Sequence, residues 1–453
     1  MINKEKSKVL FVEADNHFTD ILLSFLTLPL GRIMKLLEKH YGEEAPTIGS
    51  LNTLYHSLAD LDSSHFCTES AKLILLNPTS SFEADYERLK LDICDFQPAE
   101  DFSCTKCCRR FRSVSMYYDC STSYCGHCGQ YSSLKKVVAK KWSRAGASDG
   151  VFTTRTTSFI ISDDLHILPS VTGLVGIISI LGITDTDKSE PIKVTLGFTE
   201  IMNLLKASLI SQTPLSDIIL NKTRQMNNSI IVESEPEASL HHTEREENPK
   251  SKKMILKVTV HKSTGKLLYA QAEEDFVQFL FSFLNIPLGG VERLVAGKTC
   301  IKTINNLYRS IADLLDTKYF KTPSMKNRLV KLNLHHGCIS ENHMLPLTEE
   351  CLPASYFDLK QFYSRKFPNG KGNFLKKKRT YKVTDDLTVT PFCIVAILSS
   401  LNEMKIPISD VKELELQIGL EEGLRILKAS LTSISALNEG LMNRISEQSQ
   451  KCV

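Results

Sequence analysis

The sequence lacks the short motifs by which several enzyme classes are recognised. It contains no GxxxxGK[ST] loop for cradling phosphates, no GxSxG nucleophile elbow and no HExxH helix. The glycines of GLVGIISILG, residues 173–182, have the wrong spacing for a dinucleotide-binding turn. These absences predict a protein without a catalytic constellation, and an enzyme working in a cleft between domains is the hypothesis with the least support.

The sequence also lacks a secretory signal and a clear membrane span. Its first residues, MINKEKSKVLFVEAD, are charged and have no apolar core or small-residue cleavage site. The most apolar run, residues 165–183, is nearly long enough to cross a bilayer, but the similar run at 387–404 carries Asn402 and Glu403. We therefore expect a buried strand and helix there, no membrane contact, and an intracellular location in the cytoplasm or nucleus.

No charge sign dominates the chain, whose net charge is +3, so the surface as a whole does not indicate a polyanion partner. The length of 453 residues, with 42% hydrophobic and 24% charged residues, predicts a soluble protein of two to three domains. Because a secretory signal is missing, the thirteen cysteines are expected to be thiols or metal ligands rather than disulfides.

The chain carries an internal repeat, in which several blocks recur in the same order. KVLFVEADNHFTDILLSFLTLPLG at 8–31 matches KLLYAQAEEDFVQFLFSFLNIPLG at 266–289, and LYHSLADL at 54–61 matches LYRSIADL at 307–314. SDDLHILP at 162–169 and LLKASL at 204–209 match TDDLTVTP at 384–391 and ILKASL at 426–431. Shared order, spacing and identity predict two copies of one domain.

The repeat predicts the domain organisation. The first copy spans 1–218 and the second 254–440, with a tail at 441–453. Between the copies, residues 219–253 are polar, carry both charge signs and have almost no large apolar residues after Val232. Such a segment cannot bury enough surface to fold alone, so we expect a flexible linker.

Each copy mixes strand and helix signals. A strand at 9–13 or 267–271 leads into a helix whose apolar residues recur at steps of three and four. Pro29 and Pro287 are expected to stop or restart that helix, and Gly31 and Gly289 to permit the turn into the next one. A hairpin follows, and then a strand and a final helix over 192–209. The predicted fold class is α+β, in two tandem copies.

The two copies begin differently. The second copy starts with KMILKVTV at 253–260, and nothing in the first copy corresponds to Met254–Val258. The chain as given is therefore expected to start inside an ancestral domain. We predict that the edge left in the first copy is looser than its counterpart or is covered by another element.

One cluster of cysteines has the spacing of a metal site. Seventeen residues separate Cys104-x2-Cys107 from Cys125-x2-Cys128. Two thiolates of each pair can grip one ion from a tight turn, and two such pairs complete a tetrahedral site. The spacing predicts one structural Zn²⁺ held by these four cysteines in a zinc-ribbon insertion at about 101–131. Four protein ligands leave no position for a catalytic water.

Alternatives remain open within this zinc ribbon. Cys108, Cys120 or His127 could replace one of the four ligands, and buried free thiols are the plain alternative to a metal. The second copy keeps only Cys338 and Cys351 in the corresponding stretch and has no CxxC pair. The ribbon is thus an insertion that the shared fold can do without, and function is expected in such insertions more often than in a shared core.

The ribbon and the segment after it are basic, with aromatic residues interleaved. Cations for phosphates and aromatics for bases are what single-stranded nucleic acid requires. The residues that could bind it are Arg109, Arg110, Arg112, Lys135, Lys136, Lys140, Lys141 and Trp142. A solvated basic face is the favoured interpretation, because zinc ribbons serve protein contacts as readily and no base-reading motif is present.

Two pairs of acidic residues, Asp163-Asp164 and Asp385-Asp386, could serve acid–base or metal chemistry. Each pair lies between two alternating apolar runs, where aspartate favours turns by bonding its own backbone. We therefore predict turns rather than catalytic carboxylates.

The repeated blocks and the CxxC pairs resemble a plant family known as domain of unknown function 674. The similarity covers both copies, and its motifs are KVLFVEAD with SFLTLPLG, LNTLYHSLADL, the two CxxC pairs, and SDDLHILP with LLKASL. The resemblance implies a duplicated plant protein with no assigned biochemical activity. Cys104, Cys107, Cys125 and Cys128 match the metal-like knuckles of the family, whereas the missing first strand departs from its pattern.

Together these features predict a non-enzymatic intracellular scaffold with one structural zinc ribbon, acting through contacts with an unidentified protein partner. The alternative is a nucleic-acid-binding protein that uses the basic ribbon and the Lys/Arg-rich segment after it. No small-molecule substrate is indicated.

Overall fold

The structure of the chain is a computed structural model. It describes residues 1–86, 89, 150–181, 189–220, 253–334, 339–349 and 373–451, apart from short gaps at 4, 6, 68, 156, 298, 300, 315 and 341–342. Between 100 and 137 it describes five short strands.

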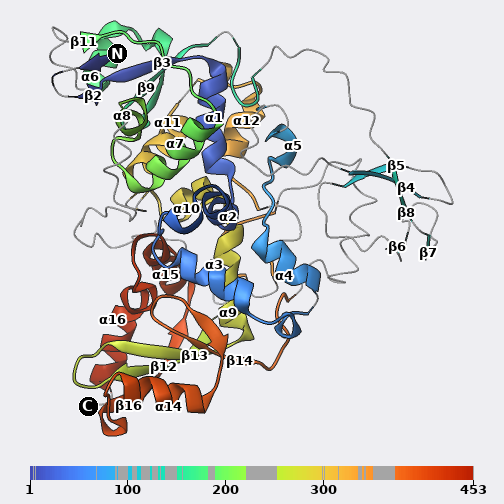
Figure 1. Cartoon of the computed structure of the whole chain (residues 1–453), viewed down its shortest axis with the longest axis vertical. Helices are drawn as coiled ribbons and strands as arrows, with labels where there is room; N and C mark the ends of the chain where they lie inside the picture. Colours follow the sequence, from blue (N-terminus) through green and yellow to red (C-terminus); the bar gives the residue numbers. More distant parts are fainter. Residues whose placement is uncertain are drawn as a thin grey trace.

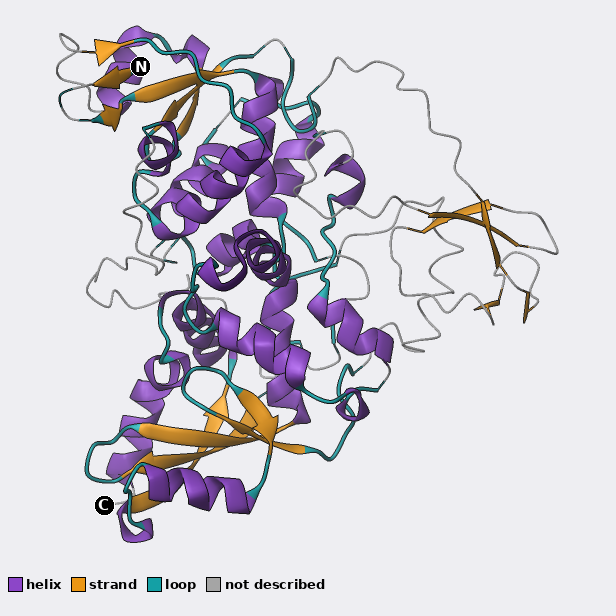
Figure 2. Ribbon diagram, viewed as in Figure 1, coloured by secondary structure: helices purple, strands orange, loops and turns teal. Residues whose placement is uncertain are grey.

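The described residues form two lobes, each with an antiparallel sheet at its outer end and helices toward the centre (Figure 2). We call the lobe with the sheets near the N-terminus the N-terminal lobe and the other the C-terminal lobe; the two chain ends mark opposite ends of the molecule (Figure 1). Strands and helices are both abundant, so the chain is α+β, as predicted.

The C-terminal lobe has a five-stranded sheet in the order β15-β14-β13-β12-β16. Its strands are β12 (Met254–His261), β13 (Leu267–Glu273), β14 (Thr380–Val383), β15 (Val389–Pro391) and β16 (Val411–Ile418). Along β12, Met254, Leu256 and Val258 are buried while the residues between them are exposed. This alternation follows from the two-residue period of a strand, and it places the core on one face of the sheet.

The N-terminal lobe has two smaller sheets. One has the order β10-β9-β3 and consists of β3 (Phe11–Ala14), β9 (Phe159–Ser162) and β10 (Ile167–Pro169). The other has the order β11-β1-β2 and consists of β1 (Ile2–Asn3), β2 (Lys8–Val9) and β11 (Ser189–Glu190). All these pairs are antiparallel.

Side chains cap the starts of several helices. Asp15 caps the first helix by accepting a hydrogen bond from Phe18 N, and Glu200 and Glu422 accept from the backbone of the glycines that precede two later helices. The helices of the first half are α1 (Asn16–Thr27), α2 (Leu30–Tyr41), α3 (Leu51–Asp60), α4 (Glu69–Leu76), α5 (Glu83–Tyr86), α6 (Leu174–Leu181), α7 (Phe198–Ile210) and α8 (Pro214–Ile219). Those of the second half are α9 (Glu274–Ser282), α10 (Leu288–Leu294), α11 (Lys302–Ala312), α12 (Pro323–Val330), α14 (Ile394–Glu403), α15 (Leu420–Thr432) and α16 (Ala436–Lys451).

The two halves of the chain exchange helices. The third helix of the first half, α3, packs on α9 and β15 in the C-terminal lobe, while α11, which carries the matching sequence block, packs on α1, α7 and β10 in the N-terminal lobe. Figure 1 shows α3 and α4 of the first half in the lower lobe, and α11 and α12 of the second half in the upper lobe. Each lobe therefore takes helices from both halves of the sequence.

Hydrogen bonds at equivalent positions of the sequence repeat fix this exchange. Val389 N donates to Ser57 Oγ at 3.0 Å, and Ile167 N donates to Ser310 Oγ at 2.9 Å. Ser57 and Ser310 are equivalent in the LYxSxADL blocks, and both are buried. Each exchanged helix thus supplies an acceptor for a strand of the other half.

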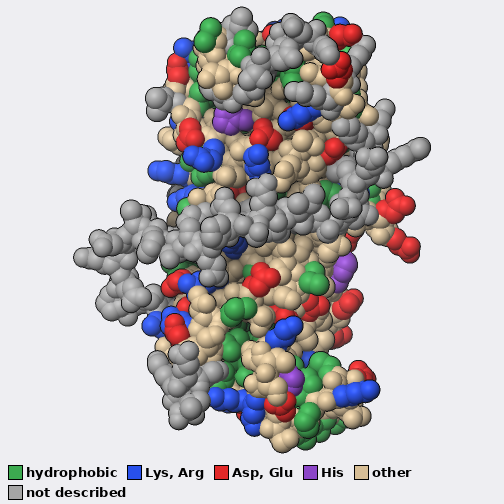
Figure 3. All heavy atoms as spheres, turned by 90° about the vertical axis from the view of Figure 1, so that its left-hand side faces the viewer, with side chains coloured by type: hydrophobic (Ala, Val, Ile, Leu, Met, Phe, Trp, Pro, Cys, Tyr) green, Lys and Arg blue, Asp and Glu red, His purple; other side chains and the backbone are tan. Residues whose placement is uncertain are grey.

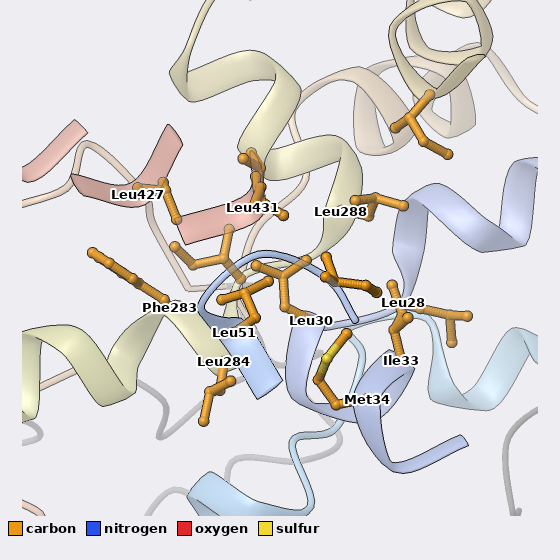
Figure 4. Close-up of a cluster of buried hydrophobic side chains, with 14 of the residues drawn as sticks. Leu28, Leu30, Ile33, Met34, Leu51, Phe283, Leu284, Leu288, Leu427 and Leu431 are labelled. Atoms are coloured by element: carbon orange, nitrogen blue, oxygen red, sulfur yellow. The ribbon is translucent and has the colours of Figure 1, made fainter. Parts of the chain in front are cut away.

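The paired SFLTLPLG and SFLNIPLG blocks meet at the centre of the molecule. Leu30 N donates to Ile286 O, and Leu288 N donates to Leu28 O, both at 2.9 Å, around a bridge between Pro29 and Pro287. Both prolines precede a helix, as predicted, because their fixed φ suits a helix entry. Figure 4 shows the apolar side chains around this crossing, with Leu30 and Leu51 from the first half beside Leu427 and Leu431 from the second.

The structure differs from several of the sequence expectations. Residues 192–196, predicted as a strand, are not in a described strand. The segment expected to be a buried helix forms α6, yet Val175 is 82% exposed and Ile177 is its only buried residue among those with described side chains. Residues 441–451, predicted as a tail, continue α16, where Leu441 and Ile445 are buried because the helix packs on α15.

Candidate functional site

The predicted zinc ribbon falls on the part of the chain where only strands are described. Cys104 ends β4 (Glu100–Cys104), in register with Leu134 of β8 (Leu134–Val137). The remaining predicted ligands, Cys107, Cys125 and Cys128, lie outside the described residues, as do the alternatives Cys108, Cys120 and His127.

Paired strands flank both CxxC sequences. β4 pairs with β5 (Arg110–Ser113), and the residues between them include Cys107; β6 (Ser123–Tyr124) pairs with β7 (Tyr131–Ser132), and the residues between them include Cys125 and Cys128. Among the residues that the structure describes, no group of three or more metal-binding side chains is found. The zinc site therefore stays a prediction.

Some of the residues predicted to contact nucleic acid lie on described strands, and the others lie outside the described residues. Arg110 and Arg112 lie on β5 and Lys135 and Lys136 on β8, while Arg109, Lys140, Lys141 and Trp142 lie outside the described residues. The register places Arg110 and Lys135 on either side of Ser103, the strand position that both oppose. Positions directly opposite each other share a face of a sheet, so this small sheet brings these two basic positions together.

The acidic pairs form turns, as predicted, and each first aspartate anchors a helix. Asp163 accepts hydrogen bonds from the backbone nitrogen and the hydroxyl of Ser216, both at 2.7 Å, at the start of α8. Asp385 accepts from Asn438 N at 2.8 Å, at the start of α16. Burial raises the pKa of both carboxyl groups, and the bonds oppose that shift. A carboxylate committed to a helix end in this way is structural.

The second aspartate of each pair closes its own turn. Asp164 accepts from the Ser162 hydroxyl at 2.5 Å, and Asp386 accepts from the Thr384 hydroxyl at 2.5 Å. Leu165 and Leu387, which follow the pairs, have φ values of 64° and 62°, a left-handed conformation that costs a leucine energy. The same strained turn thus occurs in both halves.

A buried carboxyl on α1 was not singled out by the sequence. Asp20 accepts from the backbone nitrogens of Val151 and Thr153 and from the Thr153 hydroxyl, the last at 2.8 Å. Burial raises its pKa, while these bonds lower it. Because Thr153 forms a bridge with Phe320, Asp20 fixes a segment that joins the two halves.

A second carboxyl that the sequence did not single out, Glu292 on α10, is fully buried. Burial raises its pKa to about 8, opposed by a hydrogen bond from the Thr299 hydroxyl. Its Oε2 atom has no hydrogen-bond partner among the described residues. The signal in the sequence is a mismatch between the copies, since the equivalent position in the first copy is Met34, which is also buried.

Apolar side chains reach the surface of the C-terminal lobe. On α14, Ile394, Val395 and Leu398 are exposed, whereas Ile397 and Leu401 of the same helix are buried. Met404 and Ile408, just after this helix, are also exposed. In Figure 3 apolar side chains gather toward the lower end of the molecule, which is the C-terminal lobe. The helix pattern did not distinguish these residues from core residues.

None of the helices that the structure describes combines the length and the apolar character needed to cross a membrane. No curated protein and no solved structure matches the chain. A family model described as "Protein of unknown function (DUF674)" matches residues 1–421 and, in a second overlapping match, residues 369–453. The two matches cover the whole sequence, and the chain belongs to this family.

Proposed function

We propose that this protein is a non-enzymatic intracellular scaffold that acts through protein–protein contacts and carries one structural zinc ion. The observation that carries the proposal is the exposed apolar face of α14. Large contiguous apolar patches that stay exposed on the surface of a protein mark sites of interaction.

The geometry of α14 supports a contact surface. Ile394 and Leu398 are one helical turn apart and therefore share a face, and Val395, which is 73% exposed, lies beside them. Ile397 and Leu401 point inward and hold the helix on the lobe. A partner that covers the outer face would gain roughly 1.5–3 kcal/mol for each large side chain that it removes fully from water.

The zinc ion is assigned to Cys104, Cys107, Cys125 and Cys128. The proposal is supported by their spacing and by the paired strands that flank each CxxC sequence. Four thiolates close the coordination sphere, so the ion would hold the small sheets together and perform no chemistry.

The zinc assignment is tested by metal analysis of the purified protein. We expect about one zinc ion per chain, and none in a Cys125→Ser/Cys128→Ser double variant. A Cys338→Ser/Cys351→Ser variant is the matched control and should keep its ion. A full ion in the Cys125→Ser/Cys128→Ser variant would refute the assignment.

The contact surface is tested by capture of a partner with the immobilised protein. Val395→Glu places a charge on the exposed face and should abolish capture, whereas Glu403→Gln, at the end of the same helix, should leave it unchanged. Equal recovery of the partner by the wild type and Val395→Glu would show that α14 is not the contact surface.

We further propose that the halves are two tandem copies of one domain, joined by a linker at 219–253, with the ribbon inserted in the first copy. The matched hydrogen bonds of Ser57 and Ser310 support this organisation, because equivalent residues make equivalent contacts.

Nucleic-acid binding is the second candidate function, favoured by the register that places Arg110 and Lys135 opposite the same residue. In this case the protein would bind single-stranded DNA or RNA with a steep salt dependence, and Lys140→Glu/Lys141→Glu would weaken binding. Absence of salt-dependent binding would remove this candidate.

A further inference from the structure

A run of basic residues precedes strand β14 in the C-terminal lobe. Residues 376–379 are three lysines and an arginine, and all their side chains are exposed. Within the described part of the chain, none of these side chains forms an ion pair. The carboxylate of Glu274 lies at this segment but accepts its hydrogen bond from the backbone nitrogen of Lys378. We call residues 376–379 the basic loop, and it carries an excess of positive charge.

The fold does not require the charge of the basic loop. The equivalent segment of the first half, residues 154–157, has the sequence TRTT with a single basic residue. Lys376 N donates to His65 O and Thr154 N donates to Tyr319 O, both at 2.9 Å, so the two segments occupy the same place in their lobes. Because one copy fills this place almost without charge, the charge of the other copy calls for a different explanation.

The basic loop ends beside the start of α14. Thr380, which follows the loop, accepts a hydrogen bond from Phe392 N at 3.1 Å, just before the helix begins. The helix lies on the outer face of the five-stranded sheet, where Lys382 Nζ donates to Ser400 Oγ at 3.4 Å; Figure 1 shows α14 below the sheet and α9 above it. The first turn of α14 has no acidic residue, so the positive end of the helix adds to the charge of the loop.

The exposed apolar side chains of α14 lie at this same end of the helix. Ile394 and Val395, which are 65% and 73% exposed, are in its first turn, and Leu398 follows one turn later. Asn402 and Glu403, at the other end, are exposed and polar. The surface therefore combines apolar side chains with positive charge at the end of α14 that is nearest to the basic loop.

The sign of the charge changes across the outer face of the sheet. Strand β16 forms the edge farthest from β14 and β15, and its Glu413 and Glu415 are exposed because the alternating Leu414 and Leu416 face the core. Only Lys257 of β12 lies opposite Glu415. An anionic bilayer lying flat on this face would meet these carboxylates as well as the basic loop. A nucleic acid would bring no apolar side chains to cover α14.

We propose that α14 and the basic loop together bind a segment of a partner protein that has an apolar face and acidic residues at one end. The apolar face would cover Ile394, Val395 and Leu398, and the acidic end would lie against the basic loop. Burial of the apolar side chains would supply affinity, while the charges would fix the orientation of the segment and speed its association. The inference rests on the proposed contact function of α14 and names the chemistry of the partner.

Peptide selection on the immobilised full-length protein tests the proposal, with a display library of short random sequences as the probe. We expect the selected peptides to combine apolar residues with Asp or Glu. Binding of a labelled selected peptide, measured by fluorescence anisotropy, should weaken at least about tenfold in Lys376→Glu/Lys377→Glu, because repulsion replaces attraction. The matched control is Arg155→Glu, in the equivalent segment of the first half, which should bind as the wild type does.

A peptide with reversed charge separates a charge contact from damage to the fold. The selected peptide with lysine in place of its acidic residues should bind Lys376→Glu/Lys377→Glu more tightly than it binds the wild type. Binding of the original peptide that is lost in Val395→Glu but kept in Lys376→Glu/Lys377→Glu would overturn the inference and leave α14 as a contact surface.

Other results would overturn the inference in different ways. Binding that is kept in Val395→Glu would place the peptides elsewhere on the protein, and capture of the partner would still test α14 separately. Failure to select any peptide that is both apolar and acidic would contradict the proposed chemistry. Phosphatidylserine vesicles that bind the wild type, but neither Val395→Glu nor Lys376→Glu/Lys377→Glu, would assign the surface to a membrane instead.

Discussion

The close contact between the two halves at the centre of the molecule predicts different effects of three glycine-to-alanine substitutions on stability. A Cβ atom at Gly31 would lie 3.1 Å from Leu284 Cβ and 3.2 Å from Leu284 O, closer than most real contacts. At the equivalent Gly289 it would lie 3.1 Å from Leu26 Cβ and 2.7 Å from Leu332 Cδ1. The halves approach each other here through two glycines, so each added methyl group would have to push them apart.

Two opposing effects set the change in the free energy of unfolding. Overpacking costs about 1–3 kcal/mol, while replacing a helical glycine with alanine gains up to about 1 kcal/mol. Gly31→Ala and Gly289→Ala should therefore destabilise by about 0–2 kcal/mol. Gly290→Ala has the same helical gain but no contact closer than 3.4 Å, so it should be neutral or stabilising.

Calorimetric unfolding of the three variants and the wild type measures this difference. We expect the thermal midpoints of Gly31→Ala and Gly289→Ala to lie below that of Gly290→Ala, by an amount equivalent to about 1–3 kcal/mol. Equal midpoints for Gly289→Ala and Gly290→Ala would refute the close approach of the halves at this point.

Two further predictions concern buried polar groups. Ser57→Ala and Ser310→Ala should each lower the free energy of unfolding by about 1–3 kcal/mol in urea titrations, because each leaves a buried backbone N–H without its acceptor; an effect from only one of them would contradict their equivalence. The raised pKa of Glu292 means that the folded protein holds a proton there, so its contribution to stability is complete below the unfolded pKa of 4.5 and is lost as the pH rises to about 8. Glu292→Gln should remove that loss, which amounts to at most ~1.4 kcal/mol per pH unit, and parallel stability–pH curves for the two proteins between pH 4.5 and 8 would contradict it.

Features that depend on local sequence could be predicted. Pro29 and Pro287 restart helices because proline fixes its own backbone, and the aspartate pairs make turns because their side chains bond nearby atoms. The α+β class follows from the change of apolar period along each copy.

Features that depend on distant neighbours could not be predicted. Residues 192–196 have the alternation of a strand, but a strand also needs a paired neighbour, and the N-terminal lobe supplies none in its described residues. The exchange of α3 and α11 between the lobes could not be predicted from the sequence, because the apolar face of a helix does not specify which lobe it covers. The burial of Glu292 was not predicted, because a single acidic residue in an amphipathic helix usually faces water.

The same distinction between local and distant signals applies to the candidate functional sites. The cysteine spacing is a local signal and remains the basis of the zinc proposal, while Cys107, Cys125 and Cys128 lie outside the described residues. The apolar surface of α14 became apparent only from the exposure of its side chains in the folded protein.

The exchange of helices has a consequence for synthesis on the ribosome. The N-terminal lobe needs α11, which ends at Ala312, so its core cannot close when the first half of the chain leaves the exit tunnel. α3 must likewise wait for β15, more than 300 residues later in the sequence. Contacts so distant in sequence slow folding and leave apolar surface exposed during translation. We therefore expect the nascent chain to depend on chaperones until its last third has been made.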